Sequence, residues 1–204
     1  MTLLFIFDMD DVLYDYDWRV RMAGMTEATG LSLEVMRGLW WHDEGEWAAE
    51  AGTPSTGEEY LERVNAALGT SLTEDEWVRI RGAAMTPWPE SIAAVERASE
   101  LGQITLLTNN GALSQKHLAT LAPELKDLFG EHLLTSSHYG ARKPNPVVFE
   151  RVLEAYATPA SDAFFADDLA INVKGAESVG ITGHQFTTPA KLLAAIEEFA
   201  ASRS

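Results

Sequence analysis

The sequence predicts an α/β protein with a Rossmann-like, three-layer core around a parallel sheet. Its first strand is indicated by Leu3–Phe7, five apolar residues in a row, which is typical of a strand buried on both faces of a parallel sheet. From residue 89 onward, short apolar runs alternate with helical stretches, as in consecutive βα units. The residues in between have helical spacing only. We therefore expect helices on both faces of the sheet and a helical cap inserted after the first strand.

The core elements follow from the order of apolar runs and helix signals. The expected strands cover residues 3–7, 103–108, 133–135, 163–166 and 181–185. The expected helices cover residues 90–100, 148–156, 171–179 and 189–201. Because these strands and helices alternate along the chain, the strands are expected to run parallel.

Helix signals dominate the segment after the first strand, where no convincing strand is present from about Tyr14 to Met85. Ser32 precedes apolar residues at helical spacing, and two further amphipathic helices are predicted at 56–68 and 73–84. The second of these begins with a capping box, in which Glu76 follows Thr73 by three positions.

Two prolines, Pro87 and Pro89, predict a stiff junction where the chain returns to the core. We expect a core domain made of residues 1–14 and 87–204. Residues 15–86 would form the helical cap domain, which holds five of the six tryptophans of the chain.

Composition excludes several classes of function. The 204 residues carry a net charge of −16, which argues against nucleic acid and anionic membrane surfaces as partners, because both require clustered Lys and Arg. No cysteine is present, so disulfides, thiolate zinc sites and thiol catalysis are excluded, and a cytoplasmic location is expected. The glycine-rich motifs for ATP and dinucleotides are absent, as is the nucleophile-elbow motif.

Polar residues follow three of the predicted strands. Asp8 and Asp10 come after the first, Thr108 and Asn109 end the second, and the pair at 167–168 ends the fourth. Ligands of open α/β sheets bind outside the carboxyl ends of the strands, so these residues are expected to meet at one edge. Asp8 and Asp10 alone suit either a polar turn or a site in which a divalent cation or a shared proton relieves their repulsion. The convergence of three strand ends, with a lysine in a nearby loop, favours a site.

Four motifs resemble those of the haloacid dehalogenase-like hydrolase superfamily. They are FDMDDVLYD, LLTNN, GARKPNPVVFE and FFADDLAINVKGAESVGIT, and they occur in the order and spacing of that family. The helical insert and the DD-x-x-x-N form of the last motif resemble the subfamily with a helical cap, cap type I. Within it, the motifs are similar to those of small sugar-phosphate phosphatases such as α-glucose-1-phosphate phosphatase, and to pyrimidine nucleotidases.

The resemblance implies a role for each motif residue that would act on phosphate. Asp8 would be the nucleophile that forms an aspartyl-phosphate. Asp10 would protonate the leaving oxygen and later take a proton from the hydrolytic water. Thr108 and Lys143 would be catalytic and would bind the transferring phosphoryl group, together with the backbone amide of Asn109.

The resemblance also implies Mg²⁺ as the cofactor. The ion would bind Asp8, the backbone carbonyl of Asp10, and Asp168. Asp168 is preferred to Asp167 because Asn172, a supporting residue, follows it by four positions, the interval in the commoner form of the family motif. Asp167 stays open as a ligand or as a partner of a ligand.

One position departs from the family pattern. Asp11 stands where the family usually has glycine, and the sequence leaves the effect of this change on the turn open.

Substrate choice is expected to depend on the cap, because the core motifs contact only the phosphate. Candidates for the substrate pocket are aromatic or imidazole side chains suited to sugar rings or bases, of which most would otherwise belong to the cap core. They are Tyr14, Trp18, Trp40, Trp41, His42 and Trp47.

The function predicted from the sequence is a Mg²⁺-dependent phosphomonoester hydrolase. Its substrate would be a small phosphorylated metabolite, a sugar phosphate or a nucleoside monophosphate, and the protein would be a monomer or a homodimer. Two alternatives are a sugar phosphomutase, which shares the first half-reaction, and a hydrolase of the 2-haloacid dehalogenase type. A phospho-ligand-binding module without catalysis is the remaining alternative.

Overall fold

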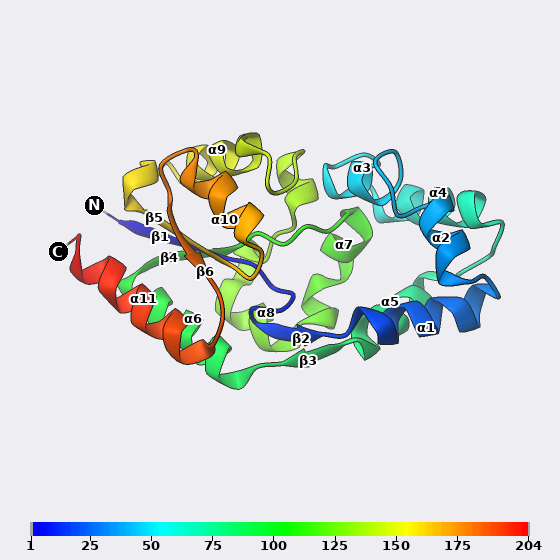
Figure 1. Ribbon diagram of the computed structural model, residues 1–204, viewed down its shortest axis with the longest axis horizontal. Helices are drawn as coiled ribbons and strands as arrows, with labels where there is room; N and C mark the ends of the chain where they lie inside the picture. Colours follow the sequence, from blue (N-terminus) through cyan, green and yellow to red (C-terminus); the bar gives the residue numbers. More distant parts are fainter. Residues whose placement is uncertain (1, 204) are drawn as a thin grey trace.

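The computed structural model describes residues 2–203 and contains a four-stranded parallel sheet (Figure 1). Its strand order is β4 (Gly102–Leu106), β1 (Leu3–Phe7), β5 (Ala163–Asp167) and β6 (Thr182–Gln185). Phe5 in the central strand pairs with Ile104 on one side and Phe164 on the other. The predicted α/β fold with a parallel sheet is confirmed.

Helices cover both faces of this sheet because β1 is apolar on both sides. Phe5 and Phe7 belong to one buried cluster, and Leu4 and Ile6 to another. The first cluster is completed by α6 (Pro89–Leu101), α8 (Pro123–Phe129) and α11 (Pro189–Ala201), and the second by α9 (Pro146–Ala155) and α10 (Ala170–Glu177). Successive side chains of β1 point to opposite faces of the sheet, so they pack against two different layers of helices.

We infer that the predicted helical cap is formed by five helices, which lie at the end of the molecule away from the two chain termini (Figure 1). They are α1 (Trp18–Thr29), α2 (Leu33–Leu39), α3 (Glu46–Glu50), α4 (Gly57–Leu68) and α5 (Glu74–Ala83). The N-cap hydroxyls of Ser32, Thr56 and Thr73 accept backbone amides as predicted, and the capping box at Thr73 is present. The cap helices pack around their own cluster, which α7 (Ala112–Leu121) of the core joins through Leu113 and Leu121.

Two short strands connect the cap to the core, where the sequence predicted only helices. β2 (Tyr14–Tyr16) and β3 (Met85–Pro87) form an antiparallel pair in which Tyr16 lies opposite Met85. Three residues are too few for a period to show in the sequence, and the pairing forms between segments that are far apart in the chain. We propose that this ribbon contains the boundaries of the cap near residues 15 and 86.

The strand expected at 133–135 is also wrong. Thr135 makes only an isolated bridge to Thr108, and short 3₁₀ turns stand on either side at Gly130–His132 and Ser136–Tyr139. The amide and hydroxyl of Thr135 both bind the side-chain oxygen of Gln115, which replaces a ladder partner.

The helices within residues 2–203 are short, and the longest two, α6 and α11, have 13 residues each. None of them combines the length and the apolar character that crossing a membrane requires.

Candidate active site

The carboxyl ends of β1, β4 and β5 lie at one edge of the sheet, and the predicted core residues meet there. They line a cavity of about 280 Å³. Its walls include Asp8, Asp10, Thr108, Asn109, Lys143, Asp168 and Asn172, with Asp11, Arg142 and Leu169. Of the residues predicted for catalysis, metal binding or phosphate binding, Asp167 is absent from the wall because it is completely buried.

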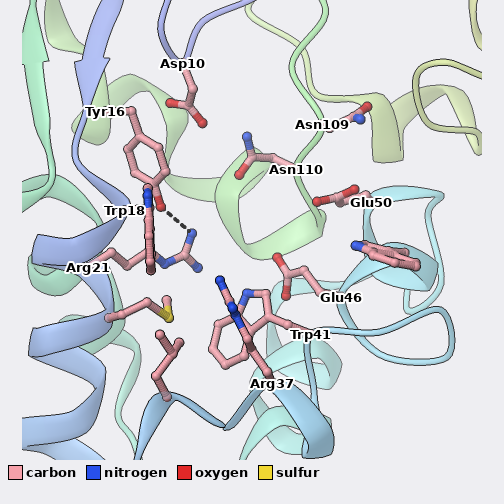
Figure 2. Close-up of a pocket in the computed structure, with 13 residues that line it drawn as sticks. Asp10, Tyr16, Trp18, Arg21, Arg37, Trp41, Glu46, Glu50, Asn109 and Asn110 are labelled. Atoms are coloured by element: carbon pink, nitrogen blue, oxygen red, sulfur yellow. Dashed lines mark hydrogen bonds between the residues drawn. The ribbon is translucent and has the colours of Figure 1, made fainter. Parts of the chain in front are cut away.

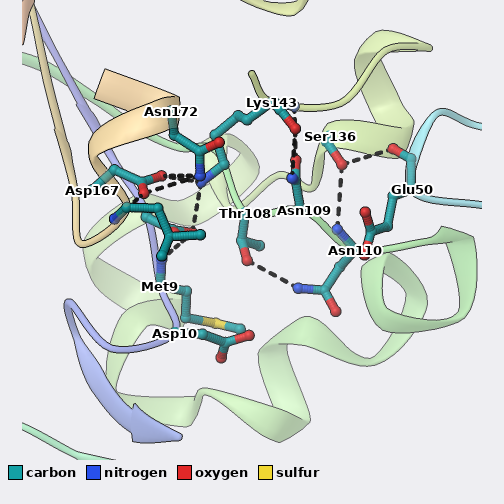
Figure 3. Close-up of polar contacts among 12 residues, drawn as sticks. Met9, Asp10, Glu50, Thr108, Asn109, Asn110, Ser136, Lys143, Asp167 and Asn172 are labelled. Atoms are coloured by element: carbon teal, nitrogen blue, oxygen red, sulfur yellow. Dashed lines mark hydrogen bonds and ion pairs between the residues drawn. The ribbon is translucent and has the colours of Figure 1, made fainter. Parts of the chain in front are cut away.

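Lys143 is the cation at the base of this cavity. Its side chain is 1% exposed, and Nζ lies 2.9 Å from Asp8 Oδ1 and 2.7 Å from Asp167 Oδ2 (Figure 3). Burial would lower the pKa of Lys143, but the two carboxylates raise it above its ordinary value. Burial also raises the pKa of Asp8, and Lys143 offsets only part of this effect. One ammonium group therefore holds two carboxylates that would otherwise repel each other.

Asp167 and Asp168 are adjacent in sequence but differ in their surroundings. Asp167 accepts hydrogen bonds from Lys143 Nζ, from Asn172 Nδ2 at 3.0 and 3.1 Å, and from the Leu169 amide at 2.9 Å. Asp168 lines the cavity, and burial together with the charges of Asp167 and Asp11 raises its pKa to about 6. Asp167 is thus fixed by the protein, and Asp168 is available to a ligand.

The acids at this edge suit a divalent cation. Oxygen atoms of Asp8, Asp167 and Asp168 lie within 4.8 Å of one another. Carboxylate oxygens are the ligands that Mg²⁺ prefers, and three acids with a single lysine leave negative charge for a cation to balance. The donor set therefore fits Mg²⁺.

The polar residues after β4 support the loop that carries Lys143. Asn109 donates from Nδ2 to the Lys143 carbonyl and accepts from the Lys143 amide, both at 2.9 Å. The buried Thr108 hydroxyl accepts a hydrogen bond from Asn110 Nδ2 at 2.9 Å. The side chain of Asn109 thus orients the lysine, a role that the sequence did not indicate.

Asp10 is held by an arginine of the cap that sequence reasoning missed. Arg81, near the end of α5, places Nη2 at 2.9 Å from Asp10 Oδ1 and 2.6 Å from Oδ2. Arg81 is 1% exposed, and its guanidinium lies 4.0 Å from the ring centre of Tyr16. Its position just before the chain returns to the core is the only signal in the sequence that could have suggested it.

Asp11 occupies a turn position with left-handed backbone geometry, at φ 58°. Glycine adopts this conformation freely, and aspartate is among the residues that tolerate it. The Asp11 side chain also accepts a hydrogen bond from the Tyr16 amide at 3.3 Å. The turn that favours glycine is therefore kept with aspartate.

A second cavity, of about 380 Å³, lies between the cap and the core and shares Asp10 and Asn109 with the first (Figure 2). Three of the candidates for the substrate pocket line it, namely Trp18, Trp41 and Trp47. Its remaining lining includes aromatic and charged side chains that the sequence did not single out. They are Tyr16, Arg21, Arg37, Glu46 and Glu50.

The other pocket candidates are not part of this lining. Tyr14 is 1% exposed, and its hydroxyl donates to Glu124. Both ring nitrogens of His42 contact backbone atoms of its own loop, the Leu39 carbonyl and the Glu44 amide. Trp40 is buried in the cap cluster.

Comparison with known proteins gives consistent matches over most of the chain. A family model described as haloacid dehalogenase-like hydrolase matches residues 2–180. A protein of Mycobacterium tuberculosis named as a phosphatase is 30% identical over 190 residues, which cover 88% of this chain and 84% of that protein.

Solved structures with low sequence identity share the fold. A Bacteroides thetaiotaomicron enzyme of the same family, in complex with magnesium and inorganic phosphate, has a TM-score of 0.73 at 16% identity and covers 92% of this chain and 95% of its own. A 2-haloacid dehalogenase of Pseudomonas syringae has a TM-score of 0.66 at 17% identity, with both chains fully covered.

Proposed function

Because this chain belongs to the haloacid dehalogenase-like hydrolase family, we propose that it is a phosphatase that hydrolyses phosphomonoesters through an aspartyl-phosphate on Asp8. The observation that carries this proposal is the buried contact of Lys143 with Asp8 and Asp167 at the base of a cavity that Asp168 also lines. A carboxylate beside a cation and further acids suits the attack on a phosphoryl group whose charge is then balanced by Lys143 and a metal ion.

The proposed reaction uses two displacements. In the first, an oxygen of Asp8 forms a bond to phosphorus while the bond to the leaving oxygen breaks, and that oxygen takes a proton from Asp10. In the second, a water oxygen bonds to phosphorus and gives a proton to Asp10, and the bond between Asp8 and phosphorus breaks. Asp10 lines both cavities, so it lies between the place of the phosphoryl group and that of the leaving group.

The remaining polar residues bind and orient. Lys143 would neutralise the phosphoryl oxygens, and Thr108 and the amide of Asn109 would hydrogen-bond to them. Asp8, Asp168 and the backbone carbonyl of Asp10 would hold Mg²⁺, which supplies positive charge at the phosphoryl group when bound. Asp167 fixes Lys143 and accepts from Asn172, so we assign it to the support of the site.

The proposed substrate is a small phosphorylated metabolite, a sugar phosphate or a nucleoside monophosphate. The cap cavity has room for a small leaving group, and it lies directly beside the phosphoryl cavity. The acid pair at 167–168 suits a bound cation. This favours phosphoryl chemistry over dehalogenation, because a haloacid carries one negative charge and has no phosphate oxygens for the cation to bind. A phosphomutase would differ by releasing an isomeric sugar phosphate in place of inorganic phosphate.

The test is hydrolysis of p-nitrophenyl phosphate with Mg²⁺, with and without a chelator, by the wild-type protein and by Asp8→Asn. We expect loss of at least about a thousandfold in kcat for the variant, because the nucleophile is removed. Chelation should stop the wild-type enzyme, and Mg²⁺ should restore it. Release of phosphate by Asp8→Asn at the wild-type rate would refute the mechanism.

A further inference from the structure

The lining of the cap cavity contains acidic side chains, Asp10, Glu46 and Glu50, together with basic ones, Arg21 and Arg37 (Figure 2). Glu46 is 7% exposed, and its Oε2 accepts hydrogen bonds from Trp40 Nε1 at 2.6 Å and from the Tyr60 hydroxyl at 2.7 Å. These two bonds fix the carboxylate. Its second oxygen, Oε1, has no hydrogen-bond partner within residues 2–203 and is available to a donor in the cavity.

Arg21 provides the opposite charge. It is 7% exposed, lies over the ring of Trp77 at 5.4 Å, and donates from Nη1 to the Tyr16 hydroxyl at 3.2 Å. Burial would lower the pKa of Arg21, but Tyr16, Tyr60 and Glu46 raise it overall. The guanidinium is a permanent cation whose charge Glu46 offsets, and its remaining N–H groups can donate to a ligand.

Glu50, at the border with the core, is a second carboxylate that lies next to an arginine. Its Oε2 accepts from Arg142 Nε at 2.5 Å. Burial and the charge of Glu46 raise the pKa of Glu50 to about 7 despite this ion pair. Near neutral pH, its carboxyl group can therefore accept or donate a hydrogen bond.

Guanidinium groups lie close to two of the three tryptophan rings in the wall of the cap cavity. The guanidinium groups of Arg19 and Arg37 lie 5.0 and 5.5 Å from the ring centre of Trp18, and that of Arg142 lies 5.4 Å from Trp47. Trp41 has no ring or cation partner among residues 2–203. A flat base held between two aromatic faces does not match this wall, whereas a ring with one apolar C–H face against Trp41 does.

From these contacts we propose that the leaving group is an uncharged, hydroxyl-rich ring of the size of a hexose, recognised by Glu46, Glu50, Arg21 and Trp41. This inference rests on the proposed phosphatase function and narrows its substrate class. Hydroxyl groups both donate and accept, so one ring satisfies the carboxylates and the guanidinium together. The lining holds three carboxylates, Asp10, Glu46 and Glu50, against two guanidinium groups, Arg21 and Arg37, so it offers no excess of positive charge to a second phosphate.

The experiment compares hexose phosphates with a phosphate ester whose ring carries no hydroxyl groups. Glucose, mannose and galactose 6-phosphates are each compared with cyclohexylmethyl phosphate, which presents a ring of the same size without hydroxyls. Adenosine and uridine 5′-monophosphates and phosphoserine complete the panel. We expect kcat/KM for at least one hexose phosphate to exceed that for cyclohexylmethyl phosphate, the nucleotides and phosphoserine by at least about tenfold, since hydrogen bonds to charged groups carry that much discrimination.

Variants then assign the preference to the cavity. Glu46→Gln should reduce the ratio of kcat/KM for the hexose phosphate over cyclohexylmethyl phosphate by about tenfold, mainly through KM. Trp41→Leu, at the open wall, provides a second variant if Glu46→Gln does not fold, and the same direction is expected. Glu44→Gln is the control, because Glu44 is exposed in the loop just before α3 and lies outside the lining.

The outcomes separate this inference from the proposed function. A protein that hydrolyses p-nitrophenyl phosphate but prefers a nucleotide, phosphoserine or cyclohexylmethyl phosphate overturns the inference alone. An unchanged ratio in folded Glu46→Gln and Trp41→Leu overturns it as well. A protein that hydrolyses no ester with Mg²⁺ refutes the phosphatase function itself.

Discussion

The core half of the candidate active site carries more negative charge than its own buried cation balances, whereas each carboxylate of the cap half lies near an arginine. In the core half, Asp8, Asp167 and Asp168 share Lys143 as their buried cation within residues 2–203. In the cap half, Asp10 pairs with Arg81. The two aspartates at the end of β1 thus face opposite electrostatic conditions although they are two residues apart.

The cap cavity continues the second pattern. Glu50 pairs with Arg142, and Glu46 offsets Arg21. The two halves therefore suit different ligands. The core half can bind a further cation, whereas the cap half offers hydrogen bonds and one aromatic face to an uncharged group. The predictions below test that contrast.

The largest expected effect is the loss of kcat when Lys143, the buried cation of the core half, is replaced. Lys143→Met should reduce kcat for p-nitrophenyl phosphate by at least about a thousandfold, because Asp8 and Asp167 would then face each other and the phosphate without a lysine. Steady-state kinetics measures this, with Lys174→Met as the control on the exposed side of α10. Activity within tenfold of the wild type would show that the core half does not depend on this charge.

Added Mg²⁺ should stabilise the folded protein through the same acids. At a hundred times its dissociation constant, a ligand that binds only the folded state adds about 2.7 kcal/mol to the free energy of unfolding. Denaturant unfolding with and without Mg²⁺ measures the gain. Asp168→Asn should remove most of it and Asp43→Asn, on the exposed cap loop, should not; equal gains in both variants would place the ion elsewhere.

The pair of Asp10 and Arg81 tests the contact between the halves. Arg81→Gln should lower kcat by about ten- to a hundredfold with little change in KM, because Asp10 loses the partner that positions it. Arg79→Gln, which is exposed on the same helix, is the matched control. If the Arg81 variant folds and keeps the wild-type kcat, the contact has no catalytic role.

The environment of Glu50 in the cap half can be tested by the pH dependence of the free energy of unfolding. The pKa of Glu50 is raised from 4.5 to about 7 in the folded protein, so the folded state holds a proton that the unfolded state has lost in this range. Stability from this group is therefore present below about pH 4.5 and decreases by about 1 kcal/mol per pH unit toward pH 7. The difference in unfolding free energy between the wild type and Glu50→Gln, measured at pH 5 and 8, should shift against the wild type as pH rises. A difference independent of pH would contradict the raised pKa.

Much of the core half could be predicted because its signals are local. Asp8, Thr108 and the acids at 167–168 follow apolar runs, and the carboxyl ends of parallel strands lie at one edge of the sheet. Asp8 and Thr108 could thus be placed together before their contacts were known, whereas Lys143, which lies in a loop, was placed with them by the family resemblance. The helix caps at Thr56 and Thr73 were likewise readable because capping depends on residues within one turn.

The cap half could not be predicted in this way. Arg81 reaches Asp10 across 71 positions, and no periodic pattern distinguishes it from other helix arginines. Glu46 and Arg21 were not singled out either, because only the packing of the helices brings their side chains to the wall of one cavity. Tyr14, an aromatic residue near the first motif, is buried, and its hydroxyl donates to Glu124. Its place in the substrate pocket stays a prediction.

The ribbon of β2 and β3 has a consequence for how this enzyme could be rebuilt. Since Tyr16 lies opposite Met85, the insert begins and ends at the same place, and the core is bridged there by two adjacent strands. An insert of another size or shape could be grafted between these strands without stretching β1 or β4. Such a graft would have to keep an arginine at the place of Arg81, because this residue of the insert holds Asp10.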